Sequence, residues 1–196
     1  MRNAAISIIL LGILSTPVVA QQLLVPMDDV QTDHLRAYGL TWWCLKEPRA
    51  YECEWLLNYR AGAFMLPDRP NVRARAGEMG VSVQPVSPAE SDAISAAIEK
   101  SNMQRLHLTK APEIAVYTPS YTEPWDDAVT LALSYAQVEY DTIWDRDVMG
   151  GALEKYDWLH LHHEDFTGNY GKFFASFADQ AWYRRQVLES RAAADD

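Results

Sequence analysis

The chain has 196 residues, of which 48% are hydrophobic, 11% aromatic and 22% charged. This composition excludes a disordered tail, a collagen-like fibre and a disulfide-dense miniprotein, and it is typical of one globular domain with a sizeable core. The formal net charge of −10 argues against a nucleic-acid partner or an anionic membrane surface, because an acidic surface repels phosphate groups.

The first twenty residues have the pattern of a secretory signal peptide. Arg2 is their only charged residue, an apolar run extends from Ala4 to Leu14, and small residues lead up to Ala20. An uncleaved membrane anchor is the less favoured alternative, because the run is well short of the roughly 20 residues that span a bilayer. We therefore predict cleavage after Ala20, a single α/β domain over residues 21–196, and a periplasmic or secreted protein that does not insert into the membrane.

The two cysteines lie close together in the sequence, as Cys44 and Cys53. In an oxidising compartment they are expected to form a disulfide, which would stabilise the fold by about 2–3 kcal/mol in the chain-entropy model. The alternative is two free thiols that only contribute to packing. Their spacing is not one used by metal-binding cysteines.

In the first half of the chain, short apolar runs predict strands over residues 23–26, 54–58 and 81–83. A helix is expected to begin at Asp28 or Asp29, where acidic residues favour a helix N-terminus, and to stop before Pro48. A second helix should follow the capping box Ser87–Glu90 and end near residue 102. Residues 67–80 hold two prolines, two glycines and several arginines, and we expect a loop there.

In the second half, strands are expected over residues 114–117, 140–144 and 158–162, and helices over residues 126–138, within 145–156 and from about 172 onward. Strands that alternate with helices predict a mostly parallel sheet with helices on both faces. The strands are continuous apolar runs, as expected when both faces of a sheet are covered.

Polar residues collect where the predicted strands end, and ligands of open parallel sheets bind at the carboxyl ends of the strands. His162 and Glu164 are the candidate general acid or base, because imidazole and carboxylate groups exchange protons readily. Arg60 could hold a small anionic ligand through its planar guanidinium. The candidate ligand-binding residues are Asp28, Asn58, Arg60, His163 and Asp165.

Structural roles are the alternative for each of these residues. Asp28 could cap a helix, and Arg60 could form a salt bridge with Asp28, Asp29 or Glu164. Glu164 and Asp165 could cap the following segment. His160 could be a buried core residue. A metal site needs three convergent ligands, and on a strand His160 shares its face only with His162, so we predict no metal.

Motifs for known cofactors and nucleophiles are missing from the sequence. It contains no G-x-G-x-x-G, no P-loop, no G-x-S-x-G, no H-E-x-x-H and no C-x-x-C. We therefore expect no cofactor, and neither cysteine has the context of a nucleophile.

Three segments are similar to motifs of a known family. They are Pro26-Met27-Asp28-Asp29 with Gln31, His34, Leu35, Ala37 and Tyr38, then Trp55-Leu56-Leu57-Asn58-Tyr59-Arg60, and finally Leu159-His160-Leu161-His162-His163-Glu164-Asp165-Phe166-Thr167-Gly168. With these segments the chain resembles an exported bacterial family of largely unknown function that often carries the label "asparagine synthetase B". The resemblance implies a class I glutamine-amidotransferase-like, flavodoxin-like α/β fold.

The chain also departs from that family. Ala61 and Ala63 stand where we expect a glycine and a serine. Cleavage would leave Gln21 at the N-terminus in place of the cysteine nucleophile of a glutamine-dependent asparagine synthetase. Family members are longer, and the strand that would carry a nucleophile elbow is expected to be missing, which predicts a fold shortened at its C-terminus.

The sequence thus favours an exported amidotransferase-like α/β domain with a small-molecule site at the carboxyl ends of its strands. The alternatives are a non-catalytic envelope binding or interaction module, and an inactive, truncated member of the family. Whether the chain is an enzyme, and which protein partner it has, are left open at this point.

Overall fold

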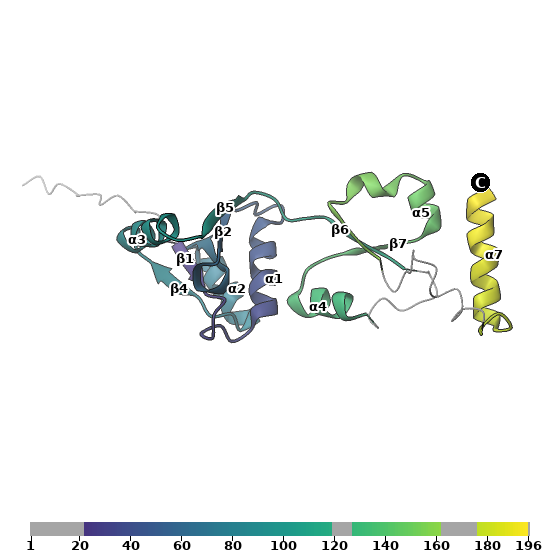
Figure 1. Cartoon of the computed structure of the whole chain (residues 1–196), viewed down its shortest axis with the longest axis horizontal. Helices are drawn as coiled ribbons and strands as arrows, with labels where there is room; N and C mark the ends of the chain where they lie inside the picture. The colour runs from purple at the N-terminus through teal and green to yellow at the C-terminus, as the bar shows by residue number, and fades with distance from the viewer. Residues whose placement is uncertain (1–21, 119–126, 162–175, 196) are drawn as a thin grey trace, which may run out of the picture.

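The structure, a computed structural model, describes residues 22–118, 127–161 and 176–195 (Figure 1). Within these residues the strands form two separate sheets. The first has five strands in the order β4-β1-β3-β2-β5, and the second has three strands in the order β7-β6-β8. The predicted signal peptide lies outside the described residues.

The five-stranded unit covers residues 22–111. Its strands are β1 (Gln22–Val25), β2 (Cys53–Leu57), β3 (Ala63–Pro67), β4 (Gln84–Val86) and β5 (Gln104–Leu108). Its helices are α1 (His34–Leu45), α2 (Pro70–Met79) and α3 (Pro88–Glu99), with a short 3-10 turn, η1 (Tyr59–Ala61). All neighbouring strands are antiparallel. The path β1-α1-β2-β3-α2-β4 with the strand order 4-1-3-2 is the split-βαβ, ferredoxin-like arrangement, extended by α3 and β5.

Helices cover both faces of this sheet. Side chains alternate along each strand, so Leu23 and Val25 of β1 pack with helices α1 and α2, whereas Leu24 packs with α3. The predicted capping box is confirmed: Ser87 accepts a hydrogen bond from the Glu90 amide, and the Glu90 carboxylate accepts one from the Ser87 amide. The central strands are therefore buried on both sides although their neighbours are antiparallel.

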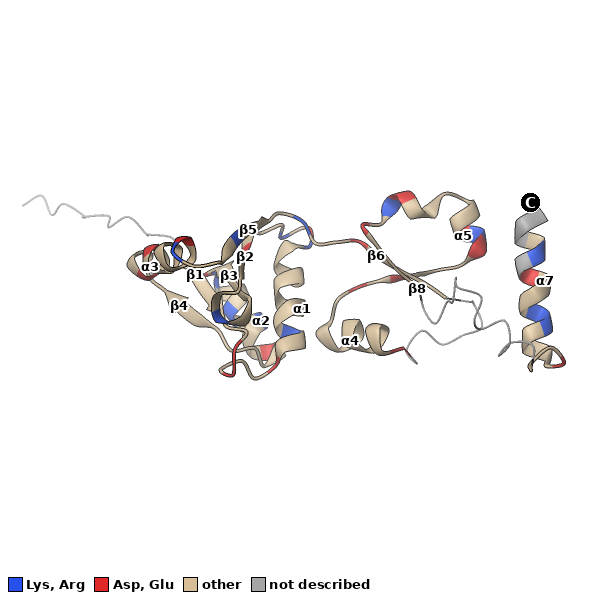
Figure 2. Cartoon of the chain, in the orientation of Figure 1, with Lys and Arg blue, Asp and Glu red and all other residues tan. Residues whose placement is uncertain are grey.

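The three-stranded unit follows from residue 113. Its strands are β6 (Ile114–Tyr117), β7 (Asp141–Ile143) and β8 (Trp158–Leu161), and its helices are α4 (Ala128–Ala136), α5 (Asp145–Met149), the 3-10 helix η3 (Ala152–Lys155) and α7 (Ala181–Asp195). All its strand pairs are parallel. Helix α7 lies beside α5, at the end of the molecule far from the first sheet (Figure 1). Both α5 and α7 carry acidic and basic residues (Figure 2). None of the described helices combines the length and the hydropathy that a bilayer crossing requires.

Helices α1 and α4 lie side by side and join the two units (Figure 1). Their backbones approach so closely that a Cβ atom at Gly39 would lie 1.7 Å from the carbonyl oxygen of Ala136. Tyr135 of α4 donates a hydrogen bond to the Asp33 carboxylate at 2.5 Å. The guanidinium of Arg36 lies over the Tyr135 ring, 4.7 Å from its centroid. This helix contact requires the absence of a side chain at position 39.

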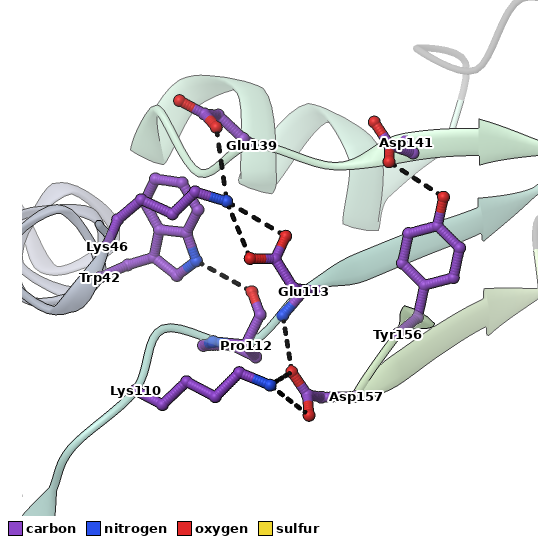
Figure 3. A network of polar contacts seen from close by, with 9 residues as sticks. All are labelled: Trp42, Lys46, Lys110, Pro112, Glu113, Glu139, Asp141, Tyr156 and Asp157. Atoms are coloured by element: carbon purple, nitrogen blue, oxygen red, sulfur yellow. Dashed lines mark hydrogen bonds and ion pairs between the residues drawn. The ribbon is translucent and has the colours of Figure 1, made fainter. Parts of the chain in front are cut away.

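A polar network strengthens the same junction (Figure 3). Lys46, just after α1, donates a hydrogen bond to Glu113 at 3.0 Å and lies 3.8 Å from a carboxylate oxygen of Glu139. The indole of Trp42 donates a hydrogen bond to the carbonyl oxygen of Pro112 at 3.2 Å. The network also includes the pairs Lys110–Asp157 and Tyr156–Asp141. It fixes the segment between the two sheets against the end of α1.

The prediction of one mostly parallel, flavodoxin-like or class I glutamine-amidotransferase-like sheet is wrong. Parallel pairing is confined to the three strands of the second unit, and the larger sheet is antiparallel. Two strands, β3 and β5, were not expected, and the predicted loop over residues 67–80 contains helix α2. With β3 present, β2 and β3 form a hairpin, so β2 cannot be followed by a crossover helix. Continuous apolar runs arise here because α3 covers the second face of an antiparallel sheet.

Candidate functional site

Two of the predicted site residues, Asp28 and Arg60, meet at one corner of the five-stranded sheet. The Nε and Nη2 atoms of Arg60 donate hydrogen bonds to the Asp28 carboxylate at 2.6 and 3.0 Å. Its Nη1 atom donates to the side chain of Gln84 at 2.7 Å. This pairing with Arg60 holds the pKa of Asp28 below its usual value. The salt bridge considered as an alternative for Arg60 is thus present, and anion binding by Arg60 stays a prediction.

The backbone next to this corner is unusual. Asn58, Arg60 and Ala61 have φ values of 64°, 46° and 61°, in the left-handed region that non-glycine residues rarely adopt. The carbonyl oxygen of Arg60 accepts a hydrogen bond from the Met27 amide at 3.2 Å, and the Asn58 side chain donates one to the carbonyl oxygen of Asn102 at 3.1 Å. These contacts and the salt bridge fix the turn, which is consistent with a structural task for all three predicted residues at this corner.

The remaining predicted residues, His162, His163, Glu164 and Asp165, lie outside the described residues. The strand that precedes them, β8, belongs to the three-stranded sheet. Leu161 is the last described residue before the predicted site residues, and it pairs with Tyr117 of β6. Asp28, Asn58 and Arg60 thus belong to a different sheet from the strand that leads to His162.

An Asp–His pair, with the aspartate buried and the histidine half-buried, lies at the carboxyl end of the parallel sheet. Asp127 is the N-cap of α4, and its Oδ1 atom accepts hydrogen bonds from the amides of Val129 and Thr130 at 2.6 and 3.2 Å. The same oxygen lies 3.1 Å from Nε2 of His160 on β8. Burial raises the pKa of Asp127, but the two amides and His160 outweigh it, so the pKa is lower than usual.

Further polar groups gather at the same edge, after β6 and β7. Thr118 is only 4% exposed, and among the described residues its hydroxyl has no hydrogen-bond partner. The Tyr117 ring stacks on Trp144 with 4.7 Å between centroids, and its hydroxyl donates a hydrogen bond to the Asp145 carboxylate. A buried hydroxyl without a partner is costly. This edge therefore combines an oriented histidine with a buried hydroxyl that has no partner within the described ranges.

Sequence reasoning missed this pair in part. The N-cap of α4 was expected at residue 126, one residue before Asp127, and His160 was considered as a core residue. The signal for Asp127 was the Asp-x-x-Thr pattern at the start of an apolar helix. No local pattern could show that His160, on a strand 33 residues away in the sequence, faces this cap.

Both cysteines are buried free thiols in the structure. A hydrogen bond with Cys44 and burial raise the pKa of the Cys53 thiol. The disulfide between Cys44 and Cys53 stays a prediction. Across the described ranges, no group of three His, Cys, Asp or Glu side chains is arranged to hold a metal ion.

Comparison of the chain with family models, curated proteins and solved structures gave no match. The resemblance to the exported family labelled "asparagine synthetase B" therefore stays a prediction, and the argument for function depends on the chain's own residues.

Proposed function

We propose that the protein binds a small polar molecule at the carboxyl edge of its three-stranded parallel sheet, where His160 receives a hydrogen bond or a proton from that molecule. The observation that supports this proposal is the Asp127–His160 contact of 3.1 Å. The carboxylate is itself fixed by two backbone amides of α4, so the imidazole is held by a rigid partner.

The chemistry follows from the two ring nitrogens of His160. A carboxylate next to Nε2 favours the tautomer in which Nε2 carries the proton, which leaves the lone pair of Nδ1 available. Within the described ranges, Nδ1 of His160 makes no hydrogen bond. A neutral imidazole held in this way can act as a general base or as a hydrogen-bond acceptor. The buried hydroxyl of Thr118, which directly follows the adjacent strand β6, would supply a donor at the same edge.

The topology supports the same edge. From β6 the chain passes through α4 to β7 on one side, and then returns through α5 and η3 to β8 on the other side. In open parallel sheets, ligands bind at the carboxyl ends of the strands where the direction of the chain reverses in this way. We also propose export to the periplasm or the exterior, because residues 1–20 have the pattern of a signal peptide.

The test is a thermal-shift screen with free amino acids, dicarboxylates and monosaccharides. We expect at least one class to raise the Tm of the wild-type protein, and this rise to be lost in His160→Gln. His34→Gln is the matched control, because it removes a histidine from the other unit. The proposal is contradicted if the ligand that stabilises the wild type stabilises His160→Gln equally.

One observation favours the alternative function, a non-catalytic interaction module. Strand β8 is an edge strand of its sheet, and Trp158, Leu159 and Leu161 are 42%, 36% and 38% exposed. Apolar side chains on an unpaired edge promote strand addition. Self-association of two copies through this edge would give a sedimentation coefficient that rises with protein concentration, and Leu159→Lys should abolish the rise.

A further inference from the structure

A cavity of about 490 Å³ opens on the part of the five-stranded sheet that α3 leaves uncovered. Helix α3 packs on Leu56 and Met65. Because side chains alternate along a strand, Glu54, two residues before Leu56 on β2, and Pro67, two residues after Met65 on β3, lie on the same face. They line the cavity floor together with Met65. This volume falls within the roughly 300–1,000 Å³ range of small-molecule sites.

The cavity wall carries two arginines, Arg49 and Arg69. The Arg49 guanidinium lies over the Trp43 ring at 4.0 Å from its centroid, and its Nε atom donates a hydrogen bond to the carbonyl oxygen of Trp43 at 2.5 Å. The Arg69 guanidinium lies over the Tyr51 ring at 4.6 Å. These contacts hold the two guanidiniums, and neither terminal nitrogen of Arg49 has an acceptor in the part of the chain that the structure describes.

These two arginines differ from the others in the same unit. Within residues 22–111 each of the remaining arginines has a carboxylate within 4 Å, namely Arg36, Arg60, Arg73, Arg75 and Arg105. Arg49 and Arg69 have none among the described residues. The chain has ten more acidic than basic residues, so acidic partners are plentiful. Two uncompensated guanidiniums beside one cavity therefore need an explanation.

Two acidic residues, Glu52 and Glu54, line the cavity. Glu54 is 14% exposed, and its carboxylate lies 3.1 Å from a nitrogen of Arg105 and 3.6 Å from Nδ1 of His107. Glu52 lies in the exposed rim and forms no ion pair with a described residue. The Glu54 carboxylate on the floor is thus paired with Arg105, whereas Glu52, Arg49 and Arg69 form no ion pair with a described residue.

The wall also has a strained backbone. Ala50, between Arg49 and Tyr51, has φ of 44°, a conformation that a residue with a Cβ atom adopts at a cost. All three residues line the cavity. Strain of this kind is concentrated at ligand sites, where the surrounding structure maintains it.

We propose that this cavity is a binding site for a small molecule that carries a carboxylate or phosphate group. The oxyanion lies between the guanidiniums of Arg49 and Arg69, whose planar forks match its geometry. The polar floor at Glu54 and His107 contacts the rest of the molecule. The site is independent of the one at His160, because the two lie in different sheets.

The test is a calorimetric titration at low salt with two probes, inorganic phosphate and succinate. We expect at least one probe to bind the wild-type protein, and Arg69→Gln to weaken it by about tenfold, as expected for one lost charge-assisted hydrogen bond. Arg49→Gln should weaken it to a similar extent. Arg73→Gln, which removes an equally charged arginine that is paired with Asp68, should leave the affinity unchanged.

Glu54→Gln should change the affinity for the probe in the opposite direction. It removes a negative charge from the floor and should tighten binding of the same probe several-fold. Binding of neither probe, or equal weakening by Arg73→Gln, would overturn the proposal. Because Arg69 is exposed, we expect Arg69→Gln to fold. It therefore tests the proposal even if Arg49→Gln does not fold. Binding in His160→Gln should equal that of the wild type, which separates this site from the proposed function.

Discussion

The two units of the molecule bury their sheets to very different extents. In the five-stranded unit, β1 and β3 are buried along nearly their whole length. In the three-stranded unit only the central strand, β6, is buried in this way, and the described part of β8 is mostly exposed. The first unit has helices on both faces of its sheet, and therefore we expect it to be stable without help from the second.

The second unit depends on the first for part of its packing. Ala136 and Val138, at the end of α4, belong to the buried cluster formed by α1, α2 and the five-stranded sheet. Ile114 of β6 belongs to it as well. The three-stranded unit thus buries part of its apolar surface against its neighbour, and loss of the α1–α4 contact should unfold the second unit while the first remains folded.

Gly39→Ala should produce the largest difference in stability between the two units. A Cβ atom at position 39 would overlap the carbonyl oxygen of Ala136 at 1.7 Å, and overpacking of this kind costs about 3 kcal/mol. We expect hydrogen exchange of the β6 amides to accelerate strongly, while the β1 and β3 amides keep most of their protection.

Gly77→Ala is the matched control for that experiment. Gly77 lies within helix α2, and no atom lies within 4 Å of the position of its missing Cβ. Alanine there should stabilise the helix by about 0.5–1 kcal/mol. If Gly39→Ala instead lowers protection equally in both units, they form one cooperative block, and the contrast between them is wrong.

The same contrast shows what sequence could reveal about the fold. Where a strand, a helix and a further strand follow one another with clear breaks, as over residues 114–161, element types and pairing were predicted well. In the first unit, helix α2 was not predicted, because the prolines and arginines of residues 67–80 indicated a loop. Yet Val72, Ala76 and Met79 are buried at helical spacing, with Pro70 at the start and Gly80 at the end. The signal was present but was outweighed by composition.

The candidate sites divide in a similar way. Asp28 and Arg60 were expected to share one site with His162. The structure pairs Asp28 with Arg60 in a salt bridge, whereas β8, the strand that leads to His162, belongs to the other sheet. The cavity at Arg49 and Arg69 could not be predicted, because its lining comes from segments brought together only by the antiparallel pairing of β2, β3 and β5. His160 faces Asp127 only because β8 pairs with β6. Local sequence patterns do not indicate which distant strands pair with each other.

A fall in pH should destabilise the three-stranded unit, by less than Gly39→Ala does. The pKa of Asp127 is lower than usual in the folded protein, mainly because two amides and His160 outweigh burial. A lowered pKa gives stability that is present above the ordinary Asp value of about 3.9 and is lost as the pH falls through the folded value. Asp127→Asn keeps a good helix cap but removes the titrating group.

The acid dependence is measured by the protection of β6 amides between pH 5 and pH 3. We expect the wild-type protein to lose more protection over this range than Asp127→Asn, while Asp28→Asn changes only the five-stranded unit. Equal pH dependence of β6 in the wild type and in Asp127→Asn would contradict the role given to this carboxylate.

The smallest effect is expected from Ser87→Ala, which probes the first unit alone. Ser87 caps α3 through a reciprocal pair of hydrogen bonds with Glu90, and loss of such a cap costs about 1 kcal/mol. Since α3 covers one face of the five-stranded sheet, the β1 and β3 amides should exchange roughly fivefold faster. The β6 amides exchange through opening of the second unit in our account, so their rates should stay unchanged. A parallel acceleration of β6 would mean that the two units open only together.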